Sequence, residues 1–498
     1  MNLDAAALYR AVESRDRRFE GRFVIGVLTT GIYCRPGCPA RLPRPENVRF
    51  FACAAAAEST GLRPCRRCRP EAAPGTPASL GTGATVARAL RLIDEGGLDG
   101  AGIEELAARL GLGGRHLRRL FVEQLGASPL AIARSRRVHF ARKLLDETDL
   151  PMVEVAAAAG FGSLRRFNTE VRGVFQRSPT ELRSRRKGPL LPSGDGARLG
   201  LRLAYKPPHD WHAAVDFLRA RAIPGVERVD TTSYQRTITL GGVSGIIDVR
   251  PAASGAHFLE LRVPVAFAPQ LHAVAARVGR LFDLGADPAA IDDHLARSPR
   301  LAPLVARRPG LRVPGAWDGF ELAVRAVLGQ QISVAGATTL SGRIVRAFGA
   351  ALGEPSTEGL THLFPTAAAL AEGDIASIGL PRARGETIRA LAAAVRDHAL
   401  TLAMPPSPDA ERARLAAIPG IGAWTVEYIA LRAFGEPDAF PASDRALRRA
   451  LHDKSEGDEA PSERAVARLA EPFRPFRAYA AMHLWMSLKG PPTETRMP

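Results

Sequence analysis

Residues 415–428 read LAAIPGIGAWTVEY, and the Pro-Gly-Ile-Gly at their centre predicts a tight hairpin between two helices. Gly420 and Gly422 allow the backbone to come close to a phosphate group, and the N–H groups at the start of the second helix point toward that phosphate. Such a contact holds DNA without reading its base sequence. This type of contact suits a protein that searches along DNA.

A carboxylate follows this hairpin in the segment Phe440-Pro-Ala-Ser-Asp444, at a predicted helix start. When an N-glycosidic bond breaks, positive charge builds on the sugar, and a fixed carboxylate can stabilise that charge or activate the incoming water. The alternative is that Asp444 is a simple helix N-cap, a position for which Asp is well suited. The spacing alone does not separate these two interpretations.

The hairpin and the Asp that follows it resemble the helix-hairpin-helix DNA glycosylase superfamily, and residues 200–490 resemble its AlkA-type 3-methyladenine DNA glycosylases. The resemblance extends to three separate segments: Tyr205–Trp211, Leu328–Ser333 and Tyr479–Trp485. It implies that Asp444 is the catalytic residue. Bifunctional relatives carry a Lys just after the hairpin glycines for Schiff-base strand cleavage. Trp424 occupies that place here, so the resemblance implies a monofunctional hydrolase.

The same resemblance implies an aromatic pocket for the damaged base, formed by Trp424, Tyr428, Trp485 and Phe217. Many alkylated purines are cationic, and electron-rich rings attract cations while they stack on a flipped base. For Phe217 the alternative is an ordinary core aromatic. Gln331 occupies the position at which the family often has an apolar wedge that fills the gap left in the duplex by the flipped base. The polar side chain of Gln331 departs from this pattern.

The amino-terminal part carries two close cysteine pairs, Cys34 with Cys38 and Cys65 with Cys68, each flanked by Gly or Pro. Four thiolates suit tetrahedral Zn²⁺, and one structural zinc ion is expected. The alternative is four free thiols. The fifth cysteine, Cys53, is expected to be a small core residue.

The sequence around these cysteines resembles the zinc domain of the bacterial Ada methylation-response family. The resemblance runs over residues 29–70, from TTGIYCRPGCPAR to GLRPCRRCRP. This resemblance implies that Cys34 accepts a methyl group from a methyl phosphotriester in DNA. Zinc keeps a thiol deprotonated and therefore nucleophilic at neutral pH. The Pro-Cys-His-Arg motif of the second Ada methyltransferase does not occur in the sequence, so repair of O6-alkylguanine is not expected.

Between these parts, apolar residues recur at helical spacing around two glycine turns, at residues 111–113 and 160–162. Each turn leads into a helix with arginines on its outer face, which is the layout of a DNA-reading helix-turn-helix. A long helix from about Leu130 to Leu145 is expected to separate the two units. The arginines predicted to contact DNA are Arg115, Arg118, Arg119, Arg165 and Arg166.

The alternative for this region is an ordinary helical bundle with solvated arginines. The phrase AGFGSLRRFNTEVRGVFQRSPTELR, ending in Gln176-Arg177-Ser178-Pro179, resembles the AraC-type regulator signature. The pair Arg165-Arg166 replaces residues often seen there, so the DNA sequence that is recognised cannot be transferred from the family.

The 498 residues carry 68 basic and 51 acidic side chains, for a formal net charge of +17, which favours a nucleic-acid partner. Hydrophobic residues make up 46 % of the chain, enough for several buried cores. Neither a membrane span nor a signal-peptide core is evident, so a cytoplasmic protein is expected. Residues 70–83 and 189–196 look like linkers.

We therefore expect a multidomain, mainly α protein with four parts. These are a small four-cysteine zinc α/β domain (1–75), an all-α AraC-type double helix-turn-helix domain (84–187), a small α/β subdomain with an antiparallel sheet (200–313) and an all-α helix-hairpin-helix glycosylase domain (314–490). The expected function is a methylation-sensing transcription regulator fused to an alkylbase glycosylase. Its expected partners are double-stranded DNA and RNA polymerase.

Two alternatives remain open at this level. The glycosylase-like half of a pure transcription regulator could bind DNA without catalysis, or the front half of a glycosylase could serve only as a DNA tether.

Overall fold

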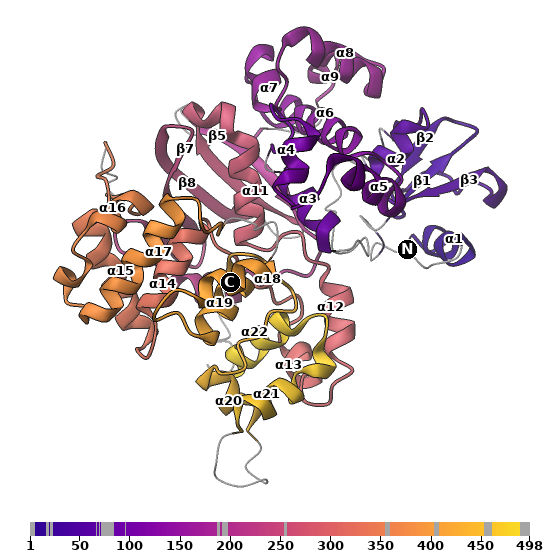
Figure 1. The fold of residues 1–498 in the computed structure, drawn as a ribbon. Helices are drawn as coiled ribbons and strands as arrows, with labels where there is room; N and C mark the ends of the chain where they lie inside the picture. Colours follow the sequence, from indigo (N-terminus) through magenta and orange to yellow (C-terminus); the bar gives the residue numbers. More distant parts are fainter. Residues whose placement is uncertain are drawn as a thin grey trace, which may run out of the picture. The chain divides into compact units, whose positions relative to one another are not determined.

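The computed structural model describes most of the chain, namely residues 5–15, 19, 23–65, 67–68, 70, 84–94, 96–186, 190–191, 198–252, 256–353, 359–402, 408–452 and 461–488. The expected linkers fall almost entirely outside these residues. The chain divides into two compact units. Figure 1 draws its helices and strands, coloured along the sequence. The first comprises residues 1–206, 238–279 and 284–287, and the second comprises residues 207–237, 280–283 and 288–498.

The first unit begins with the cysteine-bearing head, a four-stranded sheet of order β3-β1-β2-β4 with helix α2 against it. Strand β1 pairs antiparallel with both β2 and β3, and the two-residue strand β4 pairs parallel with β2. Tyr33 and Phe51 from the sheet and three alanines of α2 form its buried core. The elements are α1 (Ala5–Glu13), β1 (Val24–Val27), β2 (Ile32–Cys34), η2 (Pro45–Asn47), β3 (Val48–Phe51), α2 (Ala54–Ser59) and β4 (Arg63–Pro64).

Among the described residues of 84–186, seven helices follow, and they contain the same short unit twice. The pair α4 (Ile103–Ala108) and α5 (Gly114–Leu125) is repeated by α7 (Met152–Ala158) and α8 (Leu164–Phe175). Leu117, Phe121, Phe167 and Val171 are fully buried on the inner faces of α5 and α8. The remaining helices are α3 (Ala84–Asp94), α6 (Pro129–Glu147) and α9 (Pro179–Ser184).

The two copies also end alike. Helix α5 stops at Gly126 and α8 at Gln176, both with left-handed backbone. Ser128 and Ser178 then cap the next helix, each followed by a Pro at its first position. The left-handed residue terminates one helix, and the Ser side chain satisfies free N–H groups of the next. The same helix-ending and helix-capping residues thus occur in both copies, which confirms the two helix-turn-helix units and the long helix between them.

A five-stranded sheet of order β5-β9-β8-β7-β6 follows along the chain. Strands β5 and β9 pair antiparallel from Arg198↔Pro264 to Ala204↔Phe258, β8 also pairs antiparallel with β9, and β6 pairs antiparallel with β7. The antiparallel sheet that the sequence predicted for residues 200–313 is therefore present. The elements are β5 (Arg198–Ala204), α10 (Trp211–Arg219), β6 (Glu227–Val229), β7 (Tyr234–Leu240), β8 (Val243–Pro251), β9 (Phe258–Pro264), η5 (Val265–Gln270) and α11 (Leu271–Leu281).

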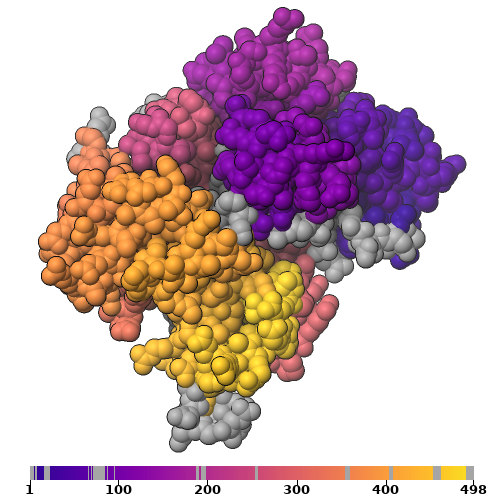
Figure 2. Space-filling view, in the orientation of Figure 1, coloured from indigo at the N-terminus to yellow at the C-terminus, as the bar shows by residue number. Residues whose placement is uncertain are grey.

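From residue 288 onward the described chain is almost wholly helical, as expected. Figure 2 shows the orange-to-yellow atoms of these helices packed into a continuous surface. Helix α14 is buried along most of its length and contacts α15, α17 and α19. The elements are α12 (Pro288–Leu295), α13 (Ala302–Arg307), α14 (Gly319–Leu328), α15 (Val334–Phe348), α16 (Ala367–Glu372), η6 (Ile375–Ile378), α17 (Arg382–Arg396), α18 (Pro408–Ala416), α19 (Ala423–Arg432), α20 (Arg445–Leu451), α21 (Glu463–Leu469), η8 (Glu471–Phe473) and α22 (Arg477–Ser487).

The fold is therefore multidomain and mainly helical, with the small sheets where the sequence predicted them. None of the helices within the described residues has the length and hydropathy needed to cross a bilayer.

Candidate zinc, DNA and glycosylase sites

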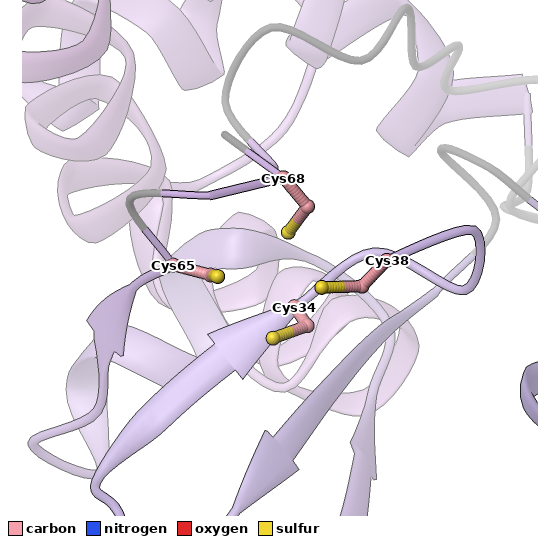
Figure 3. A group of neighbouring side chains, drawn as sticks. All are labelled: Cys34, Cys38, Cys65 and Cys68. Atoms are coloured by element: carbon pink, nitrogen blue, oxygen red, sulfur yellow. The ribbon is translucent and has the colours of Figure 1, made fainter. Parts of the chain in front are cut away.

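The four paired cysteines meet at one point in the head (Figure 3). Cys34 ends strand β2, Cys38 lies in the loop after it, and Cys65 follows strand β4. The sulfur atoms of these residues and of Cys68 all lie within 4.8 Å of one another. Four thiolates this close repel one another unless a cation lies between them, and a set of four sulfur ligands is typical of a structural Zn²⁺ site. The residues present therefore fit one Zn²⁺.

The backbone orients these ligands. The N–H of Cys65 donates to the carbonyl of Tyr33 at 2.9 Å, which fixes β4 beside β2, and the N–H of Cys38 donates to the carbonyl of Arg35 at 3.1 Å. Cys65 and Cys68 are buried, whereas Cys34 and Cys38 are only half-buried. Access from solvent is therefore greatest at the pair that contains the expected methyl acceptor.

Cys53 lies apart from this cluster. It packs against the buried core of the head, and its Sγ lies 3.5 Å from the carbonyl oxygen of Leu125. Burial raises the pKa of the Cys53 thiol, which keeps it in the less reactive protonated form. The structure thus gives Cys53 a packing position and no place among the metal ligands.

The expected DNA-reading arginines all lie on the exposed faces of α5 and α8. Arg115, Arg118 and Arg119 occupy the first two turns of α5, and Arg165 and Arg166 occupy the first turn of α8. Glu104 on α4 accepts a hydrogen bond of 3.0 Å from the N–H of Gly114, which holds the start of α5 against α4. Two of these arginines form ion pairs one turn away, Arg119 with Glu123 and Arg166 with Glu170.

The Pro-Gly-Ile-Gly segment forms the predicted turn between α18 and α19. Gly420 has φ +88°, and a Cβ there would meet Oγ1 of Thr387 at 2.2 Å, so this position requires glycine. Gly422 is exposed and is the N-cap of α19. The free N–H groups at the start of α19 therefore lie beside an open glycine surface, as a phosphate contact requires.

The turn between α14 and α15 is joined to this hairpin. The side-chain amide of Gln330 donates to the carbonyl of Gly420 at 2.9 Å and to the hydroxyl of Thr425 at 3.0 Å. The next residue, Gln331, is exposed and has φ +59°, a left-handed conformation that non-glycine residues seldom adopt. Gln331 therefore projects from a turn that is fixed to the hairpin.

Asp444 is held by four hydrogen bonds at the start of α20. Its Oδ1 accepts from the N–H groups of Ala446 and Leu447, both at 2.9 Å, and from the indole N–H of Trp485 at 3.1 Å. Its Oδ2 accepts from the indole N–H of Trp424 at 2.7 Å. Asp444 is thus a helix N-cap that is also tied to two expected pocket residues, and its side chain is only half-buried.

The aromatic side chains of α19 and α22 lie together beside this carboxylate. The rings of Trp424 and Tyr428 are stacked, with centroids 5.0 Å apart and an interplanar angle of 11°. Trp485 lies edge-on to Tyr428 at 6.3 Å. The structure therefore places Tyr428 against both tryptophans, so that three of the four expected pocket residues form one half-buried group.

Phe217 lies on α10 and is only 2 % exposed. Two guanidinium groups lie over its ring, those of Arg221 at 3.7 Å and Arg432 at 4.8 Å from the ring centroid. Arg432 also donates to the hydroxyl of Tyr428 at 2.9 Å. Phe217 is thus linked to the pocket through Arg432, and the structure shows no direct ring contact between Phe217 and the other three aromatics among the described residues.

Sequence reasoning did not single out Gln330, Arg221 or Arg432. Gln330 lies inside the segment Leu328–Ser333 that resembles the glycosylase family, and its position beside the proposed wedge Gln331 was the available signal. Arg221 follows Phe217 by four residues, and this helical spacing was a second signal that the sequence offered. Nothing local pointed to Arg432, because its partners Phe217, Pro314 and Gly315 are distant in the sequence.

Comparison with known proteins matches every part of this architecture. Residues 7–71 match the metal binding domain of Ada, residues 106–185 a helix-turn-helix domain, residues 200–318 the AlkA N-terminal domain and residues 324–475 the HhH-GPD superfamily of base excision DNA repair proteins.

Individual proteins agree with these matches. The chain is 44 % identical over 492 residues to a "Probable bifunctional transcriptional activator/DNA repair enzyme AlkA" of Mycobacterium tuberculosis H37Rv, covering 99 % of this chain and 98 % of the relative. It is 33 % identical to "DNA-3-methyladenine glycosylase 2" of Escherichia coli K12, over 59 % of this chain and 99 % of that protein. A solved 3-methyladenine DNA-glycosylase from Archaeoglobus fulgidus shares the fold, with a TM-score of 0.50 and 23 % identity over 58 % of this chain and 98 % of that one.

The fold and the sites thus define a DNA-binding regulator with an Ada-type zinc domain, joined to a helix-hairpin-helix DNA glycosylase of the AlkA type. The chain belongs to the family of bifunctional transcriptional activator and DNA repair proteins that the mycobacterial relative represents.

Proposed function

We propose that Cys34 is the methyl acceptor of a DNA-methylation sensor, and that Asp444 is the catalytic residue of a monofunctional glycosylase for alkylated purines such as 3-methyladenine. The domain division proposed for these roles is 1–75, 84–187, 200–313 and 314–490. The carboxylate of Asp444, tied to the indoles of two half-buried pocket residues, is the observation that carries the enzymatic part.

In the sensor, the Cys34 thiolate attacks the methyl carbon of a methyl phosphotriester. A new S–C bond forms, the C–O bond breaks, and its electron pair leaves with the phosphodiester. Bound Zn²⁺ supplies the charge that keeps the sulfur deprotonated. Four thiolates with one Zn²⁺ carry a formal charge of −2, and methylation changes it to −1. Repulsion from the DNA backbone then weakens, so methylation strengthens DNA binding by the whole regulator.

In the glycosylase, the Asp444 carboxylate stabilises the sugar as positive charge develops, or activates the incoming water. Trp424, Tyr428 and Trp485 receive the flipped base, with Phe217 behind them, and Gln331 enters the gap in the duplex. Gly420 and Gly422 contact a phosphate. Trp424 occupies the place of the Schiff-base Lys of bifunctional relatives, so strand cleavage is not expected.

Arg115, Arg118, Arg119, Arg165 and Arg166 contact operator DNA in this proposal. A regulator of this type would recruit RNA polymerase, and the protein would act on DNA in the cytoplasm.

One experiment tests both activities. The full chain is incubated with methylated duplex DNA, and freed bases and the intact protein mass are followed together. We expect 3-methyladenine release and the gain of one methyl group, which peptide mapping assigns to Cys34. Release without methyl gain would overturn the sensor and leave only a tethered glycosylase, whereas methyl gain without release would leave only the regulator.

Asp444→Asn tests the catalytic role. We expect it to lower base release by at least about 100-fold, because the anionic charge is lost. Asp318→Asn is the matched control, since Asp318 also caps a helix, accepting from the N–H of Glu321 at 3.0 Å, but makes no pocket contact in the hydrogen bonds described. Equal activity of the two variants would show that Asp444 acts only as a cap.

A further inference from the structure

The hydroxyl of Tyr428 lies among three arginines. Arg432 on α19 donates to its oxygen at 2.9 Å. Arg221, just after α10, and Arg325 on α14 both interact electrostatically with the same hydroxyl. On the other side, the Tyr428 ring faces Trp424 and Trp485, which carry no charge.

The charges of these arginines are unequally balanced. Arg325 pairs with Glu227 at 3.2 Å and with Glu321 at 3.4 Å, and these carboxylates also pair with Arg236. Neither Arg221 nor Arg432 has a carboxylate partner within the part of the chain that the structure describes. Arg432 instead donates to the carbonyls of Pro314 and Gly315. A buried cation without a counter-charge is unfavourable, so an anion between these two groups would be strongly stabilised.

Tyr428 is the group placed to supply that anion. Burial by itself would raise the pKa of Tyr428, but the charges of Arg432 and Arg221, the hydrogen bond from Arg432 and the charge of Arg325 outweigh burial and lower its pKa to about 8. A phenolate has more electron density in its ring than a phenol, so it attracts a stacked cation more strongly.

We propose that Arg221 and Arg432 are positioning residues that set the substrate preference of this glycosylase: by facing the Tyr428 oxygen they stabilise its phenolate, and the charged ring favours cationic alkylated bases over neutral ones. This inference rests on the proposed glycosylase function and specifies how its pocket distinguishes substrates. The phenolate also offsets the repulsion that the two arginines would exert on a cationic base.

The ionisation is tested without any substrate. The ultraviolet absorbance of tyrosinate in the full chain is titrated from about pH 6 to about pH 12, a range that also covers ordinary tyrosine ionisation near pH 10. We expect an early step, meaning a rise in absorbance below the pH of ordinary tyrosine ionisation, with the amplitude of one of the six tyrosines. This step should be absent in Tyr428→Phe, and its midpoint should lie about one pH unit higher in Arg221→Gln. Tyr479→Phe should keep the step, because burial raises the pKa of Tyr479.

Substrate preference is tested with two duplexes, one containing 3-methyladenine, whose base carries a fixed positive charge, and one containing ethenoadenine, whose base is neutral. We expect the ratio of their release rates to rise about tenfold across the early step in the wild type. The ratio should stay flat in Tyr428→Phe and rise at higher pH in Arg221→Gln.

An early step that survives in Tyr428→Phe, or its absence from the wild type, would overturn the assignment even if bases are released. A wild-type ratio that does not change with pH would overturn the substrate preference. An early step without release of any base would refute the proposed glycosylase while leaving the charge state of Tyr428 in place.

Discussion

The indole N–H of Trp424 donates a hydrogen bond of 2.7 Å to Oδ2 of Asp444, across the hairpin helix α19 and the start of α20. This bond fixes the carboxylate and the pocket ring relative to each other. A positioned carboxylate needs no reorganisation when charge develops on the sugar. The proposed pocket wall and the proposed catalytic group are therefore parts of one hydrogen-bonded assembly.

Trp424→Phe separates these two roles, because it keeps an aromatic ring and removes the N–H. We expect base release to fall about tenfold, the effect of losing one hydrogen bond to a charged group. Binding to abasic DNA should be retained. Single-turnover base release and a binding titration measure the two effects. Trp211→Phe is the control, since its indole N–H bonds instead to the carbonyl of Thr231.

Zinc removal should unfold the head of the protein. We expect one Zn²⁺ per chain by elemental analysis, and its loss on chelation should destabilise the sheet that bears Cys34, since binding energy at such sites is folding energy. Cys68→Ala should lack the ion, whereas Cys53→Ala should keep it, because Cys53 lies outside the cluster. Full zinc content in Cys68→Ala would contradict the four-cysteine site.

The two reading helices should contribute jointly to DNA binding. Replacing Arg118 and Arg165 together by Ala should weaken operator binding by at least about 30-fold, since each such contact contributes roughly 1–3 kcal/mol. If both arginines contact phosphates, the slope of log affinity against log salt concentration should decrease in magnitude by about two. The charge-matched control replaces Arg382 and Arg474, which lie outside the helix-turn-helix domain. Similar footprints for both double variants would refute the predicted contacts.

The second unit should become less stable as pH rises through the range in which Asp283 ionises. Burial raises the pKa of Asp283 to about 6, although the charge of Arg312 and a hydrogen bond of 2.8 Å from the Tyr479 hydroxyl act in the opposite direction. The folded state thus holds this proton more tightly than the unfolded chain does. Protonated Asp283 therefore contributes up to about 3 kcal/mol to the free energy of unfolding. This contribution is complete below about pH 4 and is lost as the pH rises through about 6.

Asp283→Asn should remove this dependence and stabilise the unit at neutral pH. Asn also tolerates the left-handed backbone at this position, where φ is +49°. All four tryptophans lie in the second unit, so urea unfolding followed by their fluorescence at pH 4 and pH 7 measures the effect. Identical midpoints for wild type and variant at both pH values would refute the raised pKa.

Much of the architecture could be predicted because its signals are local. The helix-turn-helix units follow from apolar spacing and glycine turns, and the Ser-Pro caps at Ser128 and Ser178 repeat within a short span. The hairpin follows from the glycines at Gly420 and Gly422. Each signal acts within a few residues of the chain, where steric and hydrogen-bonding preferences suffice.

The sequence by itself predicted four parts of the chain, four cysteines that come together and an Asp at a helix start. It could not show that the carboxylate that caps α20 is also bonded to Trp485, because that indole reaches Asp444 from a helix distant in the chain. Only the tertiary structure placed Arg221 and Arg432 at the hydroxyl of Tyr428. Such contacts form because α10, α14 and α19 pack together, and they bring together residues that are far apart in the sequence, such as Arg221 and Tyr428. Local sequence patterns carry no information about such contacts.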